Sequence, residues 1–387
     1  MKGRLSAPRP LTPLEIASGV VVGADPATPA LPAYDGRPPR AALEAAILPA
    51  LLHPPCVVSF SGGRDSSAML ALAAHVARRE GLTPPIPFTV RYPDAPQTHE
   101  NEWQQLVVDH LQLREWQRLD ATDEFDILGP FAQTALRAHG VLFPFNAHTY
   151  VPMFPFAAGG TIVTGLDGDG LLACWICESA VDVLARRRAP RPRDVLRLGL
   201  FAGPRSLRQA ILSRRLRDDT TWLTDQAERA SRRAESAELA EEPMRWDKRV
   251  QWWHARRYLS LTQHFDDVLG AAAGVALSHP MLDPAFLSSM AHLGGRFGPG
   301  DRTTVMRMLF ADLLPDSALA RESKAAFDEP FFNRHSRDFA SRWDGRSVDP
   351  VLVDPQRLRA AWLSARPPVG SATLLQATWL AAEGGRP

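Results

Sequence analysis

Long apolar runs and cysteine are what this 387-residue sequence most clearly lacks. No uninterrupted apolar stretch reaches the roughly 20 residues that a membrane-spanning helix requires, so we expect no membrane span. The N-terminal stretch is interrupted by proline and arginine and has no continuous apolar segment of the signal-peptide type. Three cysteines, Cys56, Cys174 and Cys177, are too few for a disulfide scaffold in so long a chain. These absences together predict a cytoplasmic protein.

The chain also lacks a large net charge: its 44 basic residues are balanced by 43 acidic ones, and the net charge is +1. This balance argues against a bulk nucleic-acid binder and against a disordered acidic protein. Lysine is scarce: of the 44 basic residues only Lys2, Lys248 and Lys324 are lysines, so a lysine within a motif deserves inspection. Hydrophobic residues make up 45% of the chain, which suffices for a large core in about two domains.

Apolar runs typical of buried strands alternate with helical patterns in the first half of the chain. The strand-like runs lie at 56–60, 86–92, 114–120 and 161–165. The helical patterns lie at 41–52, 68–80 and 98–113. Such alternation predicts an α/β fold in which helices cover both faces of a parallel sheet. Because ligands bind at the carboxyl ends of parallel strands, the glycine-rich loops at 61–67 and 166–170 mark the expected site.

The segment VVSFSGGRDSSAML (57–70) has the order of a phosphate-binding loop: a strand, a glycine pair and the start of a helix. Glycines let backbone N–H groups close on an anion, and a helix N-terminus adds free N–H groups and partial positive charge. Ser61, Ser66 and Ser67 can donate further hydrogen bonds. Asp65 would repel a phosphate directly, so its carboxylate is better suited to a Mg²⁺ ion that also holds phosphate oxygens.

The order SGGxDSS resembles the pyrophosphate loop of the ATP pyrophosphatases, which include asparagine synthetase, argininosuccinate synthetase, GMP synthetase and tRNA-thiolation enzymes. The motifs G-x-G-x-x-G and G-x-x-x-x-G-K-[ST] are both absent from the sequence. The resemblance implies an adenine nucleotide alpha-hydrolase-like fold and cleavage of ATP to AMP and pyrophosphate. The residues that it implies for nucleotide binding are Ser59, Ser61, Gly62, Gly63, Asp65, Ser66, Ser67, Val90 and Gly165. Among them, Val90 marks the strand edge whose backbone would hold the adenine.

Four further segments resemble the synthetase domain of asparagine synthetases and follow one another in its order. They are VTGLDGDGLLACW (163–175), HPMLDPAF (279–286), DRTTVMRMLFADLLP (301–315) and ARESKAAFDEPF (320–331). In the first segment Asp169 falls on the second metal-binding aspartate, so the resemblance implies that Asp65 and Asp169 hold Mg²⁺. In the last segment Lys324 falls on the late catalytic lysine, whose charge would stabilise an oxyanion during acyl transfer.

The composition and the resemblance divide the chain into four parts. They are an irregular N-terminal extension (1–40), the ATP-pyrophosphatase core (41–185), a basic helical insertion (186–245) and the helical C-terminal part of the synthetase domain (246–387).

Three departures from the family pattern argue against plain asparagine synthesis. Asparagine synthetases carry a glutaminase domain with a cysteine after the initiator Met, whereas Lys2 stands second here and that domain is expected to be missing. Leu166 stands where glutamine-dependent enzymes have Glu and β-lactam-forming relatives have Tyr, and Gly170 replaces the acid after the metal aspartate. Because leucine cannot accept a proton, Asp167 becomes the candidate catalytic acid or base. These changes favour a specialised amide-forming relative such as the lasso-peptide cyclases, which the stretches LTPLEIASG and AHTYVPMFPF also resemble.

We therefore expect an ATP-dependent carbon–nitrogen ligase that uses ATP and Mg²⁺, adenylates a carboxylate and transfers the acyl group to an amine. The carboxylate would belong to a peptide or a small molecule, as in lasso-peptide macrocyclisation. A leader-peptide-binding protein or a protease would be the partner protein, and neither a membrane nor a nucleic acid is expected. Two alternatives stay open: a non-catalytic ATP-binding scaffold for a partner enzyme, and ammonia-dependent amidation of the asparagine synthetase type.

Other candidate sites have simpler explanations. Cys174 and Cys177 have C-x-x-C spacing, but a structural zinc site needs two more ligands, which favours two buried cysteines. His148 and Tyr150 either line an acyl pocket or pack in the core. The arginine-rich segment 186–218 either holds an acidic peptide or forms solvated helices.

Overall fold

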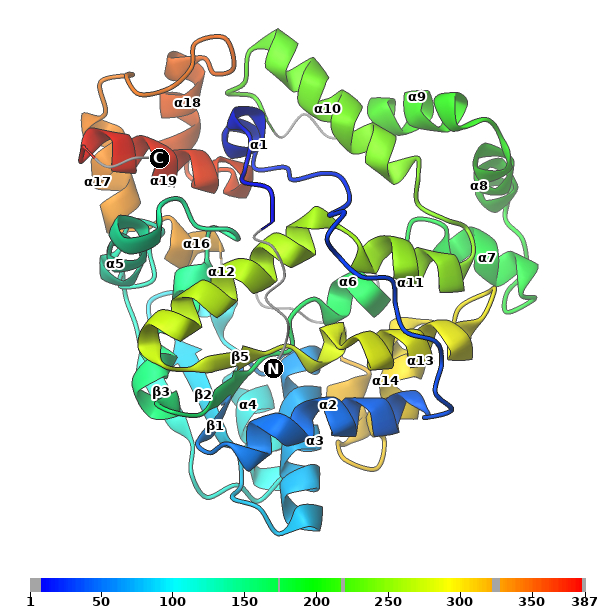
Figure 1. The fold of residues 1–387 in the computed structure, drawn as a ribbon. Helices are drawn as coiled ribbons and strands as arrows, with labels where there is room; N and C mark the ends of the chain where they lie inside the picture. Colours follow the sequence, from blue (N-terminus) through cyan, green and yellow to red (C-terminus); the bar gives the residue numbers. More distant parts are fainter. Residues whose placement is uncertain (1–7, 173–174, 217–219, 322–327, 385–387) are drawn as a thin grey trace.

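A five-stranded parallel sheet lies in the lower half of the molecule as drawn in Figure 1. The structure is a computed structural model that describes residues 8–172, 175–216, 220–321 and 328–384. The strand order of the sheet is β3-β2-β1-β4-β5, and every neighbouring pair is parallel. The strands are β1 (Cys56–Ser59), β2 (Ile86–Arg91), β3 (Gln117–Asp120), β4 (Thr161–Val163) and β5 (Ala276–Ser278). With helices on both faces, this is the α/β fold that the alternation of patterns predicts.

The residues of β1 and β4 alternate between two apolar cores. In β1, Cys56 and Val58 belong to the core on one face of the sheet, whereas Val57 belongs to the core on the other face. In β4, Val163 and Ile162 alternate in the same way. Both strands are therefore buried on both sides, which explains why they form uninterrupted apolar runs in the sequence.

Helices from distant parts of the chain cover the two faces. The core on the first face contains residues of α2 (Pro39–Leu52), α3 (Arg64–Glu80), α4 (Asn101–His110), α11 (Trp246–His254), α13 (Pro284–Gly294), α14 (Arg302–Phe310) and α15 (Asp316–Leu319). On the second face, η2 (Ala147–Ala157) contacts β1 and β4, and α12 (Arg257–Ala273) contacts β5 and η2.

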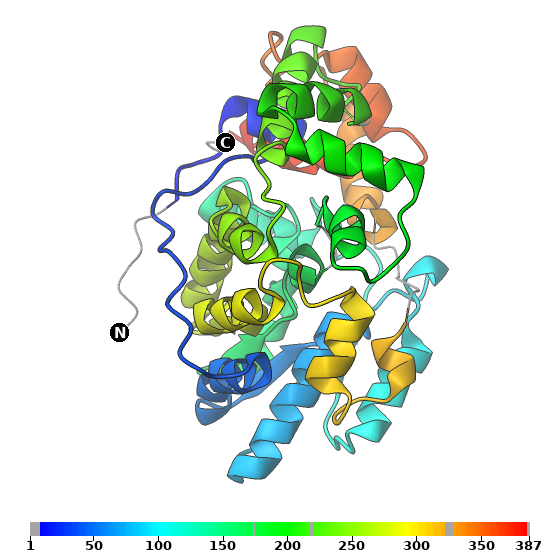
Figure 2. The same ribbon diagram turned by 90° about the vertical axis from the view of Figure 1, so that its right-hand side faces the viewer.

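The C-terminal helices, which lie at the upper left of Figure 1, share a separate apolar core. It contains residues of α1 (Pro13–Ser18), α5 (Pro130–His139), α17 (Arg334–Arg342), α18 (Pro355–Trp362) and α19 (Ala372–Ala382). At the upper right, α8 (Pro192–Ala202), α9 (Arg205–Arg215) and α10 (Asp225–Leu239) form an outer group (Figures 1 and 2). The remaining elements are η1 (Pro96–Thr98), α6 (Gly168–Leu172), α7 (Glu178–Leu184), η3 (Pro280–Leu282), α16 (Asp328–Phe331) and η4 (Val369–Ser371).

Two elements differ from the sequence-based expectation. β5 was not predicted, because three residues are too few to show an alternating pattern and the surrounding chain is helical. α1 interrupts the segment expected to be irregular, and a capping box explains it: the Thr12 N–H donates to the Glu15 carboxylate at 2.8 Å, and the Glu15 N–H donates to the Thr12 hydroxyl. Within the described ranges, no helix combines the length and the apolar character that crossing a bilayer requires.

A buried carboxylate connects the C-terminal helices to the chain that follows β3. Asp126 is fully buried and accepts hydrogen bonds from the backbone N–H groups of Leu128 at 2.8 Å, Asn333 at 2.8 Å and Ser336 at 3.0 Å. The Ser336 hydroxyl donates a fourth bond at 2.9 Å. Burial raises the pKa of Asp126, and the four donors act in the opposite direction. The carboxylate thus satisfies N–H groups at the start of α17, which the helix itself cannot satisfy.

Replacing Asp126 with Ala should lower the free energy of unfolding by about 3 kcal/mol, because several buried donors then lose their acceptor. Denaturation with guanidinium chloride measures the change. The matched control is Asp338→Asn, which alters an exposed carboxylate of the same helix and should change stability by less than about 0.5 kcal/mol. Equal stability of D126A and the parent protein would show that α17 does not depend on this cap.

Candidate functional site

The loop between β1 and α3 is closed by its own serine hydroxyls. The hydroxyl oxygens of Ser61 and Ser66 lie 3.1 Å apart, and the Gly63 N–H donates to the Ser61 hydroxyl at 3.3 Å. Gly62 has a φ of +88°, and a Cβ there would lie 2.8 Å from Cγ of Gln104, so the position requires glycine. Among the described residues no side chain caps α3 at Gly63. The first turn of α3 therefore retains the N–H donors that an anion would use.

The loop after β4 packs directly against Asp65, which lies in the first turn of α3. A Cβ on Gly165 would lie 2.8 Å from the backbone carbonyl carbon of Asp65, and a Cβ on Gly168 would lie 2.6 Å from its Cγ. Larger residues at these two positions would push the loops apart. The glycines therefore allow the second loop to approach the phosphate-binding loop at the carboxyl ends of β1 and β4.

Arg302, the first residue of α14, joins the two aspartates that the sequence assigns to metal binding. Its Nη2 donates to the carboxylate oxygens of Asp65 at 2.7 and 2.8 Å, and its Nη1 forms an ion pair with Asp169. The side chains of Arg302 and Asp65 are only 14% and 15% exposed. Burial raises the pKa of Asp65, and the charge of Arg302 acts in the opposite direction. The structure thus brings Asp65 and Asp169 within reach of one cation.

Asp167, the predicted acid or base, is paired with a tyrosine of α12. Its carboxylate accepts a hydrogen bond from the Tyr258 hydroxyl at 2.7 Å, and that hydroxyl accepts one from the Trp253 indole at 2.9 Å. Burial raises the pKa of Asp167. Asp167 also has a φ of +59°, a conformation that aspartate tolerates better than most residues. A Cβ on Gly170 would lie 2.8 Å from Cγ of Asp167, so a side chain at position 170 and this placement of Asp167 exclude each other.

Arg249 of α11 binds the loop after β4. Its guanidinium donates to the backbone carbonyls of Gly170 at 2.6 Å and Leu171 at 2.7 Å, and to the carboxylate of Glu242 at 3.1 Å. The side chain is 1% exposed, and two tryptophan rings flank the guanidinium. These bonds give the carbonyls of Gly170 and Leu171 a charged donor and tie the loop to α11.

Arg321 holds the phosphate-binding loop in a comparable way. It donates to the Gly62 carbonyl at 3.0 Å and forms a buried ion pair with Glu100. The side-chain amide of Gln104 donates to the Ser61 carbonyl at 2.9 Å. Arg321 comes three residues before Lys324 in the sequence, but Lys324 itself lies outside the described residues and its role stays a prediction.

The other predicted nucleotide-binding residues lie at the same ends of the strands. Ser59 is the last residue of β1, and Ser67 is buried in the first turn of α3. β2 continues to Arg91, three residues beyond Phe88, which is the last partner of β1. Val90 therefore lies beyond the last residue of β2 that pairs with β1. The edge of its backbone that faces β1 is outside the β1–β2 ladder.

Of three side chains whose role the sequence left open, two lie in the core and Tyr150 is partly buried against it. His148 is fully buried, its Nε2 lies 3.0 Å from the Phe125 carbonyl, and burial lowers its pKa to about 4. Tyr150 hydrogen-bonds to Thr164, and burial raises its pKa. Cys177 is buried, which raises the pKa of its thiol, and Cys174 lies outside the described residues. The part of the chain that the structure describes contains no group of three or more His, Cys, Asp or Glu residues suited to a metal.

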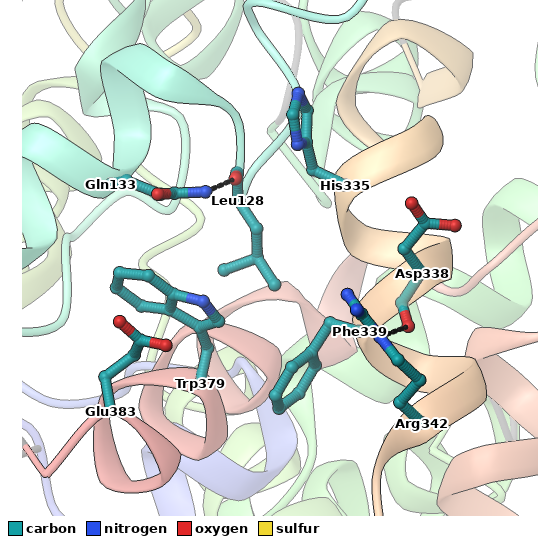
Figure 3. Close-up of a pocket in the computed structure, with 8 residues that line it drawn as sticks. All are labelled: Leu128, Gln133, His335, Asp338, Phe339, Arg342, Trp379 and Glu383. Carbon is teal, nitrogen blue, oxygen red and sulfur yellow. Dashed lines mark hydrogen bonds between the residues drawn. The ribbon is translucent and has the colours of Figure 1, made fainter.

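A cavity of about 320 Å³ lies among the C-terminal helices, away from the two loops (Figure 3). Its lining residues are Leu128, Gln133, His335, Asp338, Phe339, Arg342, Trp379 and Glu383. Aromatic rings and charged groups face it from α17 and α19. None of these lining residues belongs to the predicted nucleotide or metal site, so the cavity is separate from it.

The roles of Arg249, Arg302 and Arg321 were not predicted from the sequence. Nearly all of the 44 basic residues are arginines, so composition does not distinguish these three from solvated ones. Arg302 and Arg321 do fall within the segments 301–315 and 320–331, and their position there was the available signal.

Replacing Gly170 with Ala should lower the free energy of unfolding by about 2 kcal/mol, because the new Cβ overlaps the Asp167 carboxylate. The same substitution in a D167A background should cost clearly less, since the overlapping group is gone. Gly199→Ala in α8 is the control, because a Cβ there meets no atom within 4 Å and should not destabilise the protein. Equal costs of G170A in both backgrounds would contradict the proposed crowding.

Comparison with known proteins identifies the family. The sequence model of the family described as asparagine synthase matches residues 40–380, which include both loops, Arg249, Arg302 and Arg321. None of the curated proteins matches the chain at a significant level. The family model covers far more than half of the sequence. The chain therefore belongs to the asparagine synthase family, whose activity is that of an ATP-dependent ligase forming carbon–nitrogen bonds.

Proposed function

We propose that the protein adenylates a carboxylate of a peptide substrate with ATP and then transfers the acyl group to an amine, as in lasso-peptide macrocyclisation. The observation that carries the proposal is the meeting of the phosphate-binding loop with Asp65 and Asp169 at the carboxyl ends of β1 and β4. A pyrophosphate at the N-terminus of α3 would lie beside both carboxylates. This arrangement supports chemistry at the α-phosphorus of a bound nucleotide.

The two aspartates suit a Mg²⁺ ion. They offer carboxylate oxygens only, a single guanidinium reaches both of them, and they flank the expected phosphates. Mg²⁺ is commonly held by one or two carboxylates together with phosphate oxygens and water. We infer that Asp65 and Asp169 hold the ion, which when bound would offset the negative charge on the leaving pyrophosphate.

The proposed reaction has two steps. A carboxylate oxygen of the substrate attacks the α-phosphorus, the bond to the bridging oxygen breaks, and pyrophosphate leaves. An amine nitrogen then attacks the acyl carbon, the bond to AMP breaks, and the nitrogen loses a proton. The loop at 61–67 would bind the pyrophosphate, and Lys324 would stabilise the oxyanion of the second step. Orientation and charge stabilisation would supply most of the rate.

Asp167 is the proposed acceptor of the amine proton. Leu166, which precedes it, is a partly buried apolar residue packed on the core of the first face and has no group that binds a proton. Asp167 is already hydrogen-bonded to Tyr258, and burial raises the pKa of its carboxylate, which favours the protonated form. A carboxylate whose pKa is raised holds a transferred proton more readily than an exposed aspartate does.

We infer that a peptide suits the site better than free aspartate, because this chain departs from the asparagine synthetase pattern in the loop after β4. Leu166 stands in place of the acid of the glutamine-dependent enzymes, and Gly170 leaves room for the carboxylate of Asp167. The outer helices α8 and α9 add an exposed surface with arginines and with apolar residues such as Leu196, which is 74% exposed. An acidic leader segment of the substrate would be complementary to such a surface.

Pyrophosphate exchange into ATP should be stimulated by peptide pools from the source cell and not by free aspartate, when measured with Mg²⁺ present. Asp65→Asn should reduce this exchange by at least about 100-fold, because a metal-binding carboxylate is lost. Asp109→Asn, at an exposed position of α4, is the matched control and should retain it. Undiminished exchange in D65N would contradict the metal assignment. ATP binding without exchange for every substrate would favour a scaffold, and stimulation by aspartate with ammonia would favour amidation.

Lys324→Met should slow amide formation by at least about 100-fold in a single-turnover assay, since an oxyanion-stabilising charge is removed. Lys248→Met provides a control with the same chemical change, at an exposed position on α11. Similar rates in the two variants would exclude Lys324 from the acyl-transfer step.

A further inference from the structure

Arg302 occupies the place that a metal ion would take between Asp65 and Asp169. One terminal nitrogen of the guanidinium contacts both oxygens of Asp65, and the other contacts Asp169. The guanidinium lies between the two carboxylates and offsets their negative charge, and a divalent cation held by both would need the same space and the same charge. In this position Arg302 therefore competes with a metal ion for Asp65 and Asp169.

The backbone of Arg302 is fixed while its side chain can turn. Arg302 begins α14, and Asp301 caps this helix by accepting from the Thr304 N–H at 2.8 Å. The Nε of Arg302 is buried and, among the described residues, has no hydrogen-bond partner. A change of side-chain rotamer alone would free the two carboxylates and leave the fold of α14 unchanged.

A second guanidinium, that of Arg64, lies near Arg302, and two neighbouring cations make this part of the site suited to an anion. Arg64, between Gly63 and Asp65, donates to the Thr303 hydroxyl at 3.4 Å. Two guanidinium groups, those of Arg64 and Arg302, therefore come close together beside α14. Both lie at the N-terminus of α3, where the phosphates are expected. A phosphate oxygen there would give the displaced Arg302 a new partner.

We propose that Arg302 is an internal counter-ion that pairs with Asp65 and Asp169 in the empty site, is displaced by the divalent cation, and then binds a phosphate of the nucleotide. The proposal rests on the proposed function. It explains how two partly buried carboxylates stay paired before substrate arrives. It also implies that metal and nucleotide strengthen each other's binding, because the metal alone must displace Arg302 without offering it a phosphate.

The test compares Mn²⁺ binding to the full chain and to Arg302→Gln by electron paramagnetic resonance, with and without ATP and without any carboxylate substrate. In R302Q, Mn²⁺ alone should bind at least about tenfold more tightly, since no charged competitor has to leave. The factor by which ATP strengthens Mn²⁺ binding should fall at least about tenfold, because the phosphate loses its guanidinium partner. Unchanged Mn²⁺ affinity in a folded R302Q would overturn the counter-ion role, and an unchanged ATP factor would overturn the phosphate contact.

Two further variants complete the experiment: one is a control, and the other replaces R302Q if that variant does not fold. Arg307→Gln removes another arginine of α14, which pairs with the exposed Asp316, and should leave both Mn²⁺ measurements unchanged. If R302Q does not fold, Arg302→Lys keeps a charge but cannot span both carboxylates, so its Mn²⁺ affinity should exceed that of the parent. A folded R302K with parental affinity would overturn the proposal. Failure of the parent to bind ATP would contradict the proposed function, and binding of Mn²⁺ alone would still decide the counter-ion role.

Discussion

The charge of Asp65, held where little water reaches it, is the constraint around which the site is arranged. A buried carboxylate is stable only when it is paired, and Gly165 and Gly168 of the loop after β4 pack so closely on Asp65 that neither has room for a side chain. Those glycines bring Asp169 to the same place, and α14 contributes the cation from a segment more than 200 residues further along the chain. The neighbouring parallel strands β1 and β4 make this meeting possible, because their carboxyl ends lie at one edge of the sheet.

Arginine gives this site its rigidity as well as its charge. Arg249 and Arg321 each bind backbone carbonyls of one loop and a buried carboxylate, so each fixes a loop through a planar, branched group. A lysine could not make the same set of bonds from one position. The scarcity of lysine in this chain is thus compatible with a site in which most cations have a structural task and one lysine is reserved for the predicted chemistry.

Local signals made the first half of the site predictable. An apolar run followed by SGGRDSS specifies a buried strand, a tight turn and a helix start within a few residues, and the structure has β1 and α3 there. Arg302 and β5 were not predictable in this way, because each acquires its role from a partner far away in the sequence. Asp167 was noted as the residue next to Leu166, but its placement depends on Tyr258 and on the missing side chain at Gly170.

The core on the first face of the sheet has a consequence for how the chain reaches its native state. It combines residues between Ala42 and Ala77 with residues between Met281 and Leu319, and β5 joins β4 across more than 100 residues of chain. Contacts of such separation form slowly, because the entropy of closing a long loop must be overcome first. During synthesis, the apolar faces of β1 and α3 would leave the ribosome long before the helices that cover them. Nascent chains of this protein are therefore expected to need protection from aggregation until most of the sequence has been made.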